Sequence, residues 1–274
     1  MLKPILVITC VASLILSHDA WALDPVALVH AKHTLANAVT HGKTEELQRA
    51  RAEFSTLLAG ENTSTTLSYW VAVCDWRLVP MLTQAEPERA KKLCVEGIAA
   101  CDRVLTAQPR DAGTLALKAG LQGLSLAFFP NLTMSIGPAM MVAYGTAAGM
   151  APNDPRVAFL MALSTLHTPA QYGGGPDKAK PQFERAITLF MTEKAEKADK
   201  PDSTAADWGH DDALLWSGRC LGQLGDWAGA KSRYEQTLAV TPGHAWVRTV
   251  LLPEAERHLE QAPAPAPAPP AAEK

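Results

Sequence analysis

The apolar positions of this chain recur at helical spacing along most of its length. Near the C-terminal end, Leu214, Gly218 and Leu221 repeat every three or four residues, and Ala230 and Tyr234 are four apart. Residues at this spacing share one face of an α-helix. A Gly-Asp pair between the two runs supplies a turn signal. The pattern therefore predicts a helical hairpin in this stretch.

The same arrangement recurs upstream in four further pairs of segments. Each pair has two runs of helical periodicity joined by residues typical of turns. The predicted pairs are 26–40 with 43–54, 64–79 with 86–109, 114–127 with 137–152, and 155–167 with 176–190, and one more helix is predicted over 246–261. The chain is thus expected to be all-α, with about five helix hairpins and a C-terminal helix.

The last hairpin resembles the tetratricopeptide repeat (TPR) family. The unit 211–244 has the 34-residue period of that family, although Leu214 stands where the family often has Trp and Thr237 where it usually has Ala. The residues that carry the resemblance, here and in upstream hairpins, are Ala50, Phe54, Ala179, Phe183, Ala186, Gly218, Ala230, Tyr234 and Pro242. The resemblance implies a right-handed solenoid of stacked hairpins. It also implies a concave groove, lined by the first helices, that binds a protein or peptide partner.

Three consecutive glycines, Gly173 to Gly175, raise the question of a phosphate site. A phosphate loop needs Lys-Ser or Lys-Thr after its glycines and a strand before them. Here Pro176 and Asp177 follow, and the preceding segment is helical. Proline suits the first turn of a helix, and aspartate suits its positive end. We interpret the glycines as a turn between the two helices of one hairpin.

The stretch "GGGPDKAKPQFERA" is similar to a segment of other exported bacterial TPR proteins. A looser likeness exists to the TPR subunit associated with TRAP-type solute transporters. That subunit is normally lipid-anchored, whereas Cys10 of this chain lies inside an apolar run and lacks the lipoprotein signal. Accessory function in solute transport is therefore the weaker of the two implications.

Both ends of the chain differ from the helical region. Residues 1–22 have a basic start, an apolar run too short to span a membrane, and an A-x-A site formed by Ala20 and Ala22, which predicts a signal peptide cleaved before Leu23. Residues 263–274 are rich in alternating Ala and Pro and predict a disordered tail. The expected domain is 23–262. We expect an exported protein, periplasmic or secreted, with no membrane span.

The charge balance argues against nucleic acid as a partner. The chain has 25 Lys and Arg residues against 28 Asp and Glu residues, a formal net charge of −3. Proteins that bind nucleic acid or anionic membranes through electrostatics carry a basic excess. A protein partner remains the expected one.

Four cysteines lie in the predicted domain: Cys74, Cys94, Cys101 and Cys220. An exported chain can form disulfides, and four cysteines allow three connectivities. Cys74 and Cys94 fall on consecutive predicted helices at heights that allow pairing. The alternative is that all four are small buried apolar residues.

No set of polar residues predicts catalysis or a cofactor. His30, His33 and His41 have helical spacing but no nearby carboxylate or cysteine, so a surface helix is favoured over a metal site. His210 and Asp211 lie at a predicted helix start, where capping is favoured over acid–base chemistry because no nucleophile accompanies them. We expect no enzyme activity, no cofactor and no metal.

Six apolar residues are the candidates for partner binding. Tyr69, Trp70 and Trp76 lie on one predicted first helix, where core packing and a groove contact are both open. The apolar connection around 128–141 is the other candidate region, with Phe128, Phe129 and Met134. The charged segment 197–209 is expected to be an insertion that Trp208 fixes to the fold.

These features predict a non-catalytic scaffold that binds a protein through a concave groove. The alternative is a TPR protein that binds an apolar small molecule around 128–141. An open concave groove favours the scaffold, and an apolar cavity favours the small-molecule carrier.

Overall fold

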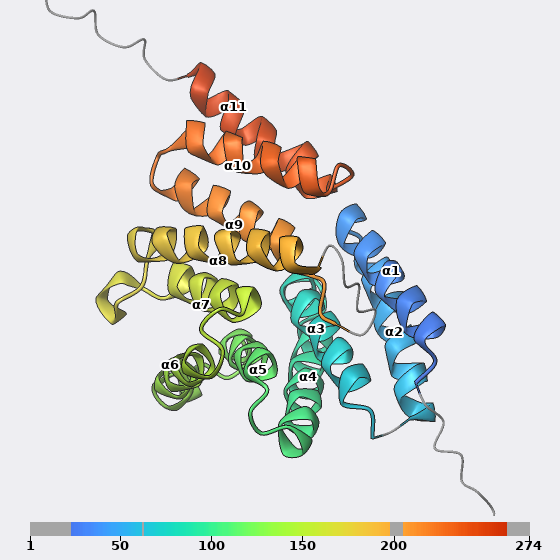
Figure 1. The fold of residues 1–274 in the computed structure, drawn as a ribbon. Helices are drawn as coiled ribbons and strands as arrows, with labels where there is room; N and C mark the ends of the chain where they lie inside the picture. Colours follow the sequence, from blue (N-terminus) through green and yellow to red (C-terminus); the bar gives the residue numbers. More distant parts are fainter. Residues whose placement is uncertain (1–22, 62, 198–204, 262–274) are drawn as a thin grey trace, which may run out of the picture.

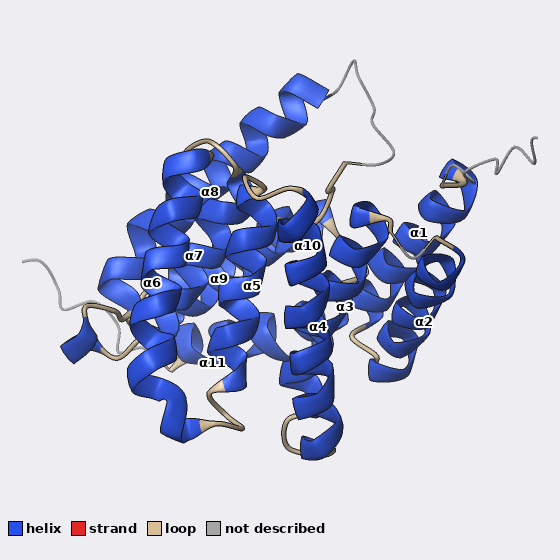
Figure 2. Ribbon diagram, turned by 90° about the horizontal axis from the view of Figure 1, so that it is seen from below, coloured by secondary structure: helices blue, strands red, loops and turns tan. Residues whose placement is uncertain are grey.

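The computed structural model describes residues 23–61, 63–197 and 205–261. The predicted signal peptide and most of the 197–209 insertion lie outside these residues, as does the Ala/Pro tail, and those predictions are not tested. The described residues form eleven α-helices and no strand (Figure 2). The helices are α1 Pro25–His41, α2 Thr44–Gly60, α3 Thr65–Leu82, α4 Pro87–Ala107, α5 Ala112–Ser125, α6 Thr133–Met150, α7 Pro155–His167, α8 Pro176–Lys197, α9 His210–Gln223, α10 Trp227–Val240 and α11 Leu252–Glu260.

Consecutive helices pair as hairpins, and the hairpins stack in chain order (Figure 1). Two short 3₁₀ helices, Pro130–Leu132 and Ala170–Tyr172, lie in the turns before α6 and α8, and a π-helical turn, Val247–Leu251, leads into α11. The stack curves, so that the start of α9 meets α3 through Asp212 and Arg77, and the residues before α9 meet α1 through Ala205 and Lys32 (Figure 1). The predicted all-α, TPR-like solenoid of five hairpins and a C-terminal helix is confirmed.

Short polar residues set where the first helices of four hairpins begin, α9 being the exception. Ser64 accepts a hydrogen bond from the backbone N–H of Leu67 at 3.2 Å, and Asp111 accepts one from Thr114 at 2.8 Å. Asp154 caps α7 in the same way and accepts from Arg156 at 2.8 Å. Such caps satisfy backbone donors that a helix start leaves unpaired.

The small-and-large pattern of the repeats is a packing pattern. Ala50, Ala179, Ala186 and Ala230 are fully buried, and Phe54, Phe183 and Tyr234 are buried beside them. A Cβ atom at Gly218 would lie 2.5 Å from the ring of Tyr234, closer than carbon atoms approach. Only glycine lets α9 and α10 pack this closely.

The glycine triplet is a turn, as interpreted from the sequence. Gly173 and Gly175 have φ values of +86° and +100°, which residues with a side chain rarely adopt. A Cβ atom at Gly174 would overlap the carbonyl oxygen of Thr168. The backbone N–H of Gly175 donates to the carbonyl of Thr165 at 2.9 Å, which ties the turn to the end of α7.

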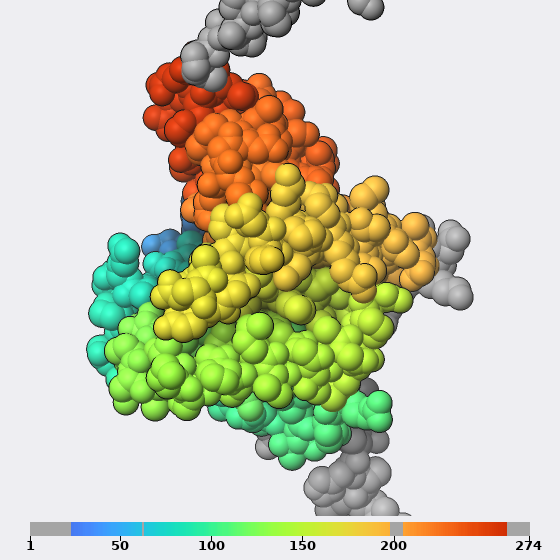
Figure 3. Space-filling model, turned by 90° about the vertical axis from the view of Figure 1, so that its left-hand side faces the viewer, coloured from blue at the N-terminus to red at the C-terminus, as the bar shows by residue number. Residues whose placement is uncertain are grey.

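Helix α6 is the exception to the regular packing. It lies along α5, but Tyr144 and Ala147 are its only fully buried residues. Its sequence has no charged residue, yet Met134, Met141 and Val142 are exposed, Met134 at 84%. In Figure 3 the green α5–α6 hairpin faces the viewer with no other helix over it. The result is an exposed apolar helix face on the outside of the solenoid.

Candidate functional site on the concave side

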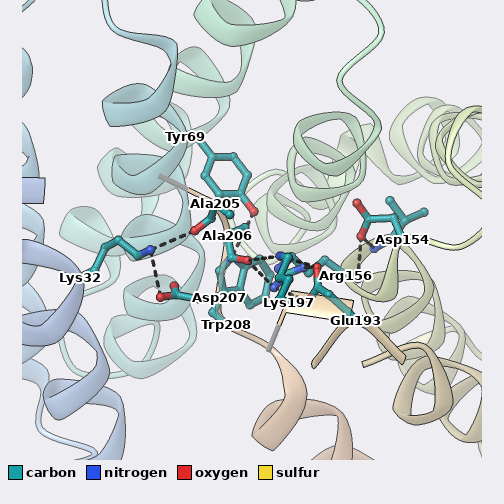
Figure 4. Close-up of polar contacts among 11 residues, drawn as sticks. Lys32, Tyr69, Asp154, Arg156, Glu193, Lys197, Ala205, Ala206, Asp207 and Trp208 are labelled. Atoms are coloured by element: carbon teal, nitrogen blue, oxygen red, sulfur yellow. Dashed lines mark hydrogen bonds and ion pairs between the residues drawn. The ribbon is translucent and has the colours of Figure 1, made fainter. Parts of the chain in front are cut away.

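The concave side is lined by the first helices and is divided into two halves. In the half nearer the N-terminus, residues 205–208, the segment Ala205-Ala206-Asp207-Trp208, lie across α1, α3 and α7 (Figure 4). We name this segment the strap and this half the closed half. In the other half, built from α7, α9 and the residues before α11, the aromatic side chains remain partly exposed. We name it the open half.

Two buried cations, Lys32 and Arg156, hold the main chain of the strap, and Lys197 makes a longer contact of 3.5 Å with the carbonyl oxygen of Ala206. The Nζ atom of Lys32, on α1, donates to the carbonyl oxygen of Ala205 at 2.9 Å and lies 2.9 Å from a carboxylate oxygen of Asp207. The Nη2 atom of Arg156, on α7, donates to the carbonyl oxygen of Ala206 at 2.6 Å. Both cationic side chains are only 6% exposed. Buried cations need such partners, since an unpaired buried charge is costly.

Arg156 is itself held by a carboxylate from α8. Its two terminal nitrogens donate to the two oxygens of Glu193 at 2.9 and 3.0 Å, a bidentate pair. Lys197 also donates to Glu193, at 2.8 Å. Burial raises the pKa of Glu193, but the hydrogen bonds from Arg156 and Lys197 outweigh this and leave the pKa below its ordinary value. Glu193 is therefore ionised at neutral pH and keeps Arg156 aimed at the strap.

Trp208 inserts into an aromatic pocket between α3 and α7. Its ring centre lies 5.5 Å from that of Trp76 and 6.4 Å from that of Phe159, and its indole N–H donates to the hydroxyl of Tyr69 at 3.0 Å. The residue is 8% exposed. Burial also raises the pKa of Tyr69, so its hydroxyl stays neutral. The indole thus has both ring contacts and a hydrogen-bond acceptor.

A buried ion pair locks the closed half to α9. The two terminal nitrogens of Arg77, on α3, donate to the carboxylate oxygens of Asp212 at 3.0 and 2.6 Å. The Arg77 guanidinium also lies over the rings of Trp76 and Trp208, 5.5 Å from each ring centre. The pair joins residues 135 positions apart and fixes the curvature of the solenoid around the strap.

A cavity of about 420 Å³ lies beside the strap. Its lining includes Tyr69, Trp70, Arg156, Glu193 and Ala206. The indole nitrogen of Trp70 and the Nε atom of Arg156 are buried, and neither has a hydrogen-bond acceptor within the described part of the chain. Both atoms are donors that are shielded from solvent, so each remains an unpaired polar group in the wall around the cavity.

The open half presents four side chains from three successive first-helix positions. His167 ends α7, Trp216 and Arg219 lie on α9, and Trp246 precedes the π-helical turn. The guanidinium of Arg219 lies over both indoles, 5.3 Å from Trp216 and 5.1 Å from Trp246. His167 meets the edge of Trp216 with ring centres 5.3 Å apart. We name these four residues the aromatic cluster.

The three aromatic residues of α3 that the sequence predicted for partner binding differ in how they are buried. Trp70 is 1% exposed and stacks on Phe54 with ring centres 5.6 Å apart, so it is part of the core. Trp76 is buried under Trp208, and Tyr69 is partly buried against it. Trp70 and Trp76 are covered in this arrangement, Trp76 by the strap, whereas Tyr69 is half-buried and lines the cavity beside the strap. The role of these three residues in partner binding stays a prediction.

The candidates on the α5–α6 hairpin lie at the surface. Phe128 and Phe129 are half-buried at the start of the turn, with Lys91 over the ring of Phe129 at 5.0 Å. Met134 is exposed. These residues therefore contribute to the exposed face of the α5–α6 hairpin and not to an enclosed apolar cavity within the described part of the chain, and their role in binding stays a prediction.

The four cysteines are free and buried, so the pairing of Cys74 with Cys94 does not form. The Cys94 thiol donates to the carbonyl of Leu121 at 3.1 Å, and the Cys220 thiol donates to that of Pro176 at 3.2 Å. Burial raises the pKa of all four thiols, to about 11 for Cys220 and about 12 for Cys94. The alternative interpretation, small buried apolar residues, describes them.

Two histidines of α1 contact different glutamates of α2. His41 pairs with Glu46 at 2.6 Å, and His30 lies 3.4 Å from Glu53. No group of three or more His, Cys, Asp or Glu side chains able to hold a metal occurs among residues 23–61, 63–197 and 205–261. Within the same residues, no helix is long and apolar enough to cross a membrane.

Asp211 and Asp212 were predicted as an N-cap or as first-turn acids of a helix, and the structure places both in the first turn of α9. Gly209 is the residue before this helix and caps it without a side chain. Asp212 also pairs with Arg77. The strap, Lys32, Arg156 and the aromatic cluster were not found from the sequence. The available signal was Trp208, an isolated tryptophan inside a charged insertion.

Comparison with known proteins gives likenesses of fold. No family model matches the chain, and no curated protein matches it by sequence. A solved structure of the HusA haemophore from Porphyromonas gingivalis matches with a TM-score of 0.57 and 24% identity, over 75% of this chain and 96% of that one. A thermophilic TPR protein from Thermus thermophilus matches with a TM-score of 0.53 and 13% identity, over 84% and 99%. The chain thus shares the TPR-like helical architecture of these two proteins.

Proposed function

We propose that this protein is a non-catalytic scaffold of the cell envelope that binds a protein partner on its concave side. The aromatic cluster carries the proposal. Tryptophan and arginine are the residues most often found at the energetic centre of protein interfaces. Here two tryptophans, an arginine and a histidine from successive first helices are left partly exposed beside each other. This is the side on which TPR solenoids bind peptides.

Site-specific photo-crosslinking tests the proposal. A photoreactive phenylalanine at position 246 should crosslink a discrete envelope protein, identified by mass spectrometry. The matched control is position 227, because Trp227 lies on the second helix α10 and stacks on His258 instead of facing the groove. Crosslinking of the same protein from both positions, or from neither, would contradict concave-side binding. Trp246→Ala should abolish co-purification of that partner.

Export is part of this proposal. The domain is expected to begin at Leu23 after removal of residues 1–22 and to carry the tail 263–274. Intact-mass measurement of the protein from the periplasm or medium checks it. A mature chain that begins at Met1, or one that stays in the cytoplasm, would contradict it.

A second candidate function is binding of a planar apolar ligand on α6. Two observations favour it: the exposed face of α6 has Met134, Met141 and Val142 without any charge, and a protein of the same architecture is a haemophore. Methionine adapts its shape to flat apolar surfaces. Haemin is therefore the probe to use, and its Soret absorbance is the measurement. Met141→Asp should abolish a haemin-induced Soret shift, while Met191→Asp, at another exposed methionine on α8, should not.

A further inference from the structure

The strap lies in the closed half in the way a bound peptide would. Its contacts are of two kinds: carbonyl oxygens of the main chain, which any peptide has, and one aromatic side chain in a fitted pocket. The carbonyl contacts contribute affinity that does not depend on the peptide's sequence, and the pocket selects for the side chain that fits it. The concave side of this chain therefore already contains a peptide-binding arrangement, filled by the chain itself.

The contacts define what the closed half selects. Trp76, Phe159 and Tyr69 surround a large aromatic ring that carries an N–H donor. Lys32 lies beside the preceding residue and pairs with its carboxylate. An acidic residue followed by tryptophan satisfies both positions. Arg156 requires only the carbonyl of the residue before the acid.

A cavity of about 420 Å³ lies beside Ala206, so there is free space next to the strap. The Nζ–carboxylate contact at Asp207 is also the weakest point of the strap, because that side chain is 63% exposed to competing water.

We propose that the strap is an internal ligand that closes this half of the groove against extended peptides containing an Asp-Trp pair. The inference rests on the proposed scaffold function, since it assigns the specificity and the regulation of the same concave side. A partner with an acidic–aromatic segment binds there only after displacing Ala205–Trp208. The protein by itself is then the autoinhibited form, and its apparent affinity is reduced by the small fraction of open molecules.

The first test loosens the strap without removing its tryptophan. Asp207→Lys replaces an attraction to Lys32 with a repulsion, and the fold is expected to tolerate it because the side chain is exposed and no packing is lost. The probe is a fluorescein-labelled peptide of sequence Ala-Ala-Asp-Trp-Gly, blocked at its C-terminus, and the measurement is fluorescence anisotropy. We expect binding about tenfold tighter than to the parent chain. Glu260→Lys, the same charge change at an exposed position on α11, should leave the affinity unchanged.

The second test vacates the pocket. Trp208→Ala should bind the same peptide more tightly still, and the peptide should raise its melting temperature. A peptide with Ala in place of Trp should do neither. If the Trp208→Ala chain does not fold, the Asp207→Lys comparison alone decides the question.

The inference is overturned if neither variant binds the Asp-Trp peptide more tightly than the parent chain, or if the peptide without tryptophan binds equally well. This failure is separate from failure of the scaffold function. A partner that crosslinks to position 246 but ignores both strap variants would retain the scaffold and eliminate the internal ligand. If no partner crosslinks to position 246 but the strap variants still bind the Asp-Trp peptide more tightly, the internal ligand is retained and the proposed scaffold function is lost.

Discussion

The two halves of the concave side are both built mainly from first helices, but they differ in how their polar and aromatic side chains are covered. In the closed half, the charged side chains Lys32, Arg156 and Asp212 are almost fully buried, and each pairs with the strap or with another helix. In the open half, Arg219 lies over two indoles that remain partly in water. In the described arrangement, the closed half is the part of the groove that the strap covers, and the open half is the part that it leaves uncovered.

This difference also separates stability from binding. Removing a group from the closed half leaves a cavity or an unpaired buried charge, both of which are costly. Removing a group from the open half exposes little that was buried and changes mainly the surface offered to a partner. Matched substitutions in the two halves should therefore differ strongly in their effect on the free energy of unfolding.

The largest difference is expected between two tryptophans. Trp208→Ala should lower the free energy of unfolding by about 3–5 kcal/mol, because it empties the pocket between Trp76 and Phe159. Trp246→Ala should cost less than half as much, since its ring is only partly buried. Urea unfolding followed by circular dichroism measures both. Equal losses would mean that the two halves are equally structural.

The two arginines provide the next contrast. Arg77→Met should cost about 3 kcal/mol, because it leaves the carboxylate of Asp212 buried without its cation. Arg219→Met should cost about 1 kcal/mol or less, because it removes cation–π contacts at a partly exposed site. A double variant Arg77→Met with Asp212→Leu should recover part of the first loss. No recovery would show that the pair does not act as a unit.

A smaller effect is expected at the glycine that follows the strap. Gly209 has φ +108°, and a Cβ atom there would lie 2.8 Å from the ring of Phe190. Gly209→Ala should therefore cost about 1–3 kcal/mol and loosen the strap. Gly137→Ala, in the exposed helix α6 with no atom within 4 Å, should be neutral or stabilising by up to about 1 kcal/mol. Thermal unfolding measures the melting temperatures of the two variants. A Gly209→Ala protein as stable as the parent chain would contradict the need for glycine at this position.

The smallest effect is a pH dependence next to the strap. Burial, together with Lys194, lowers the pKa of His210, although Asp211 opposes the shift. The folded chain therefore binds this proton more weakly than the unfolded chain, so its contribution to stability is complete above about pH 6.5 and is lost as the pH falls through the folded pKa. His210 should therefore lower the urea midpoint at pH 5.5 relative to pH 7.5, whereas Asp75, whose pKa burial raises to about 6, acts in the opposite direction and makes the comparison with a His210 variant necessary. His210→Gln should reduce that difference, and an unchanged difference would contradict the assignment.

Particular residues show where the sequence was sufficient. Gly218 with Tyr234 predicted a helix hairpin because close packing of two helices needs a small residue opposite a large one, a rule that acts within one hairpin. Gly173 and Gly175 predicted a turn for an equally local reason. Trp70 was open to two interpretations, because helical spacing alone does not tell which neighbour covers a ring. Phe54 of the preceding hairpin covers it.

The sequence by itself determined the all-α class, the pairing of the helices and the positions of the turns, since these depend on periodicity, caps and glycines within about 35 residues. Only the tertiary structure decided the state of the groove. Lys32 meets Ala205 across 173 positions, and Trp208 meets Tyr69 across 139. Contacts at such separations leave no periodic signal, because they arise from the curvature that the stacked hairpins add together, and this curvature brings the strap onto the first helices.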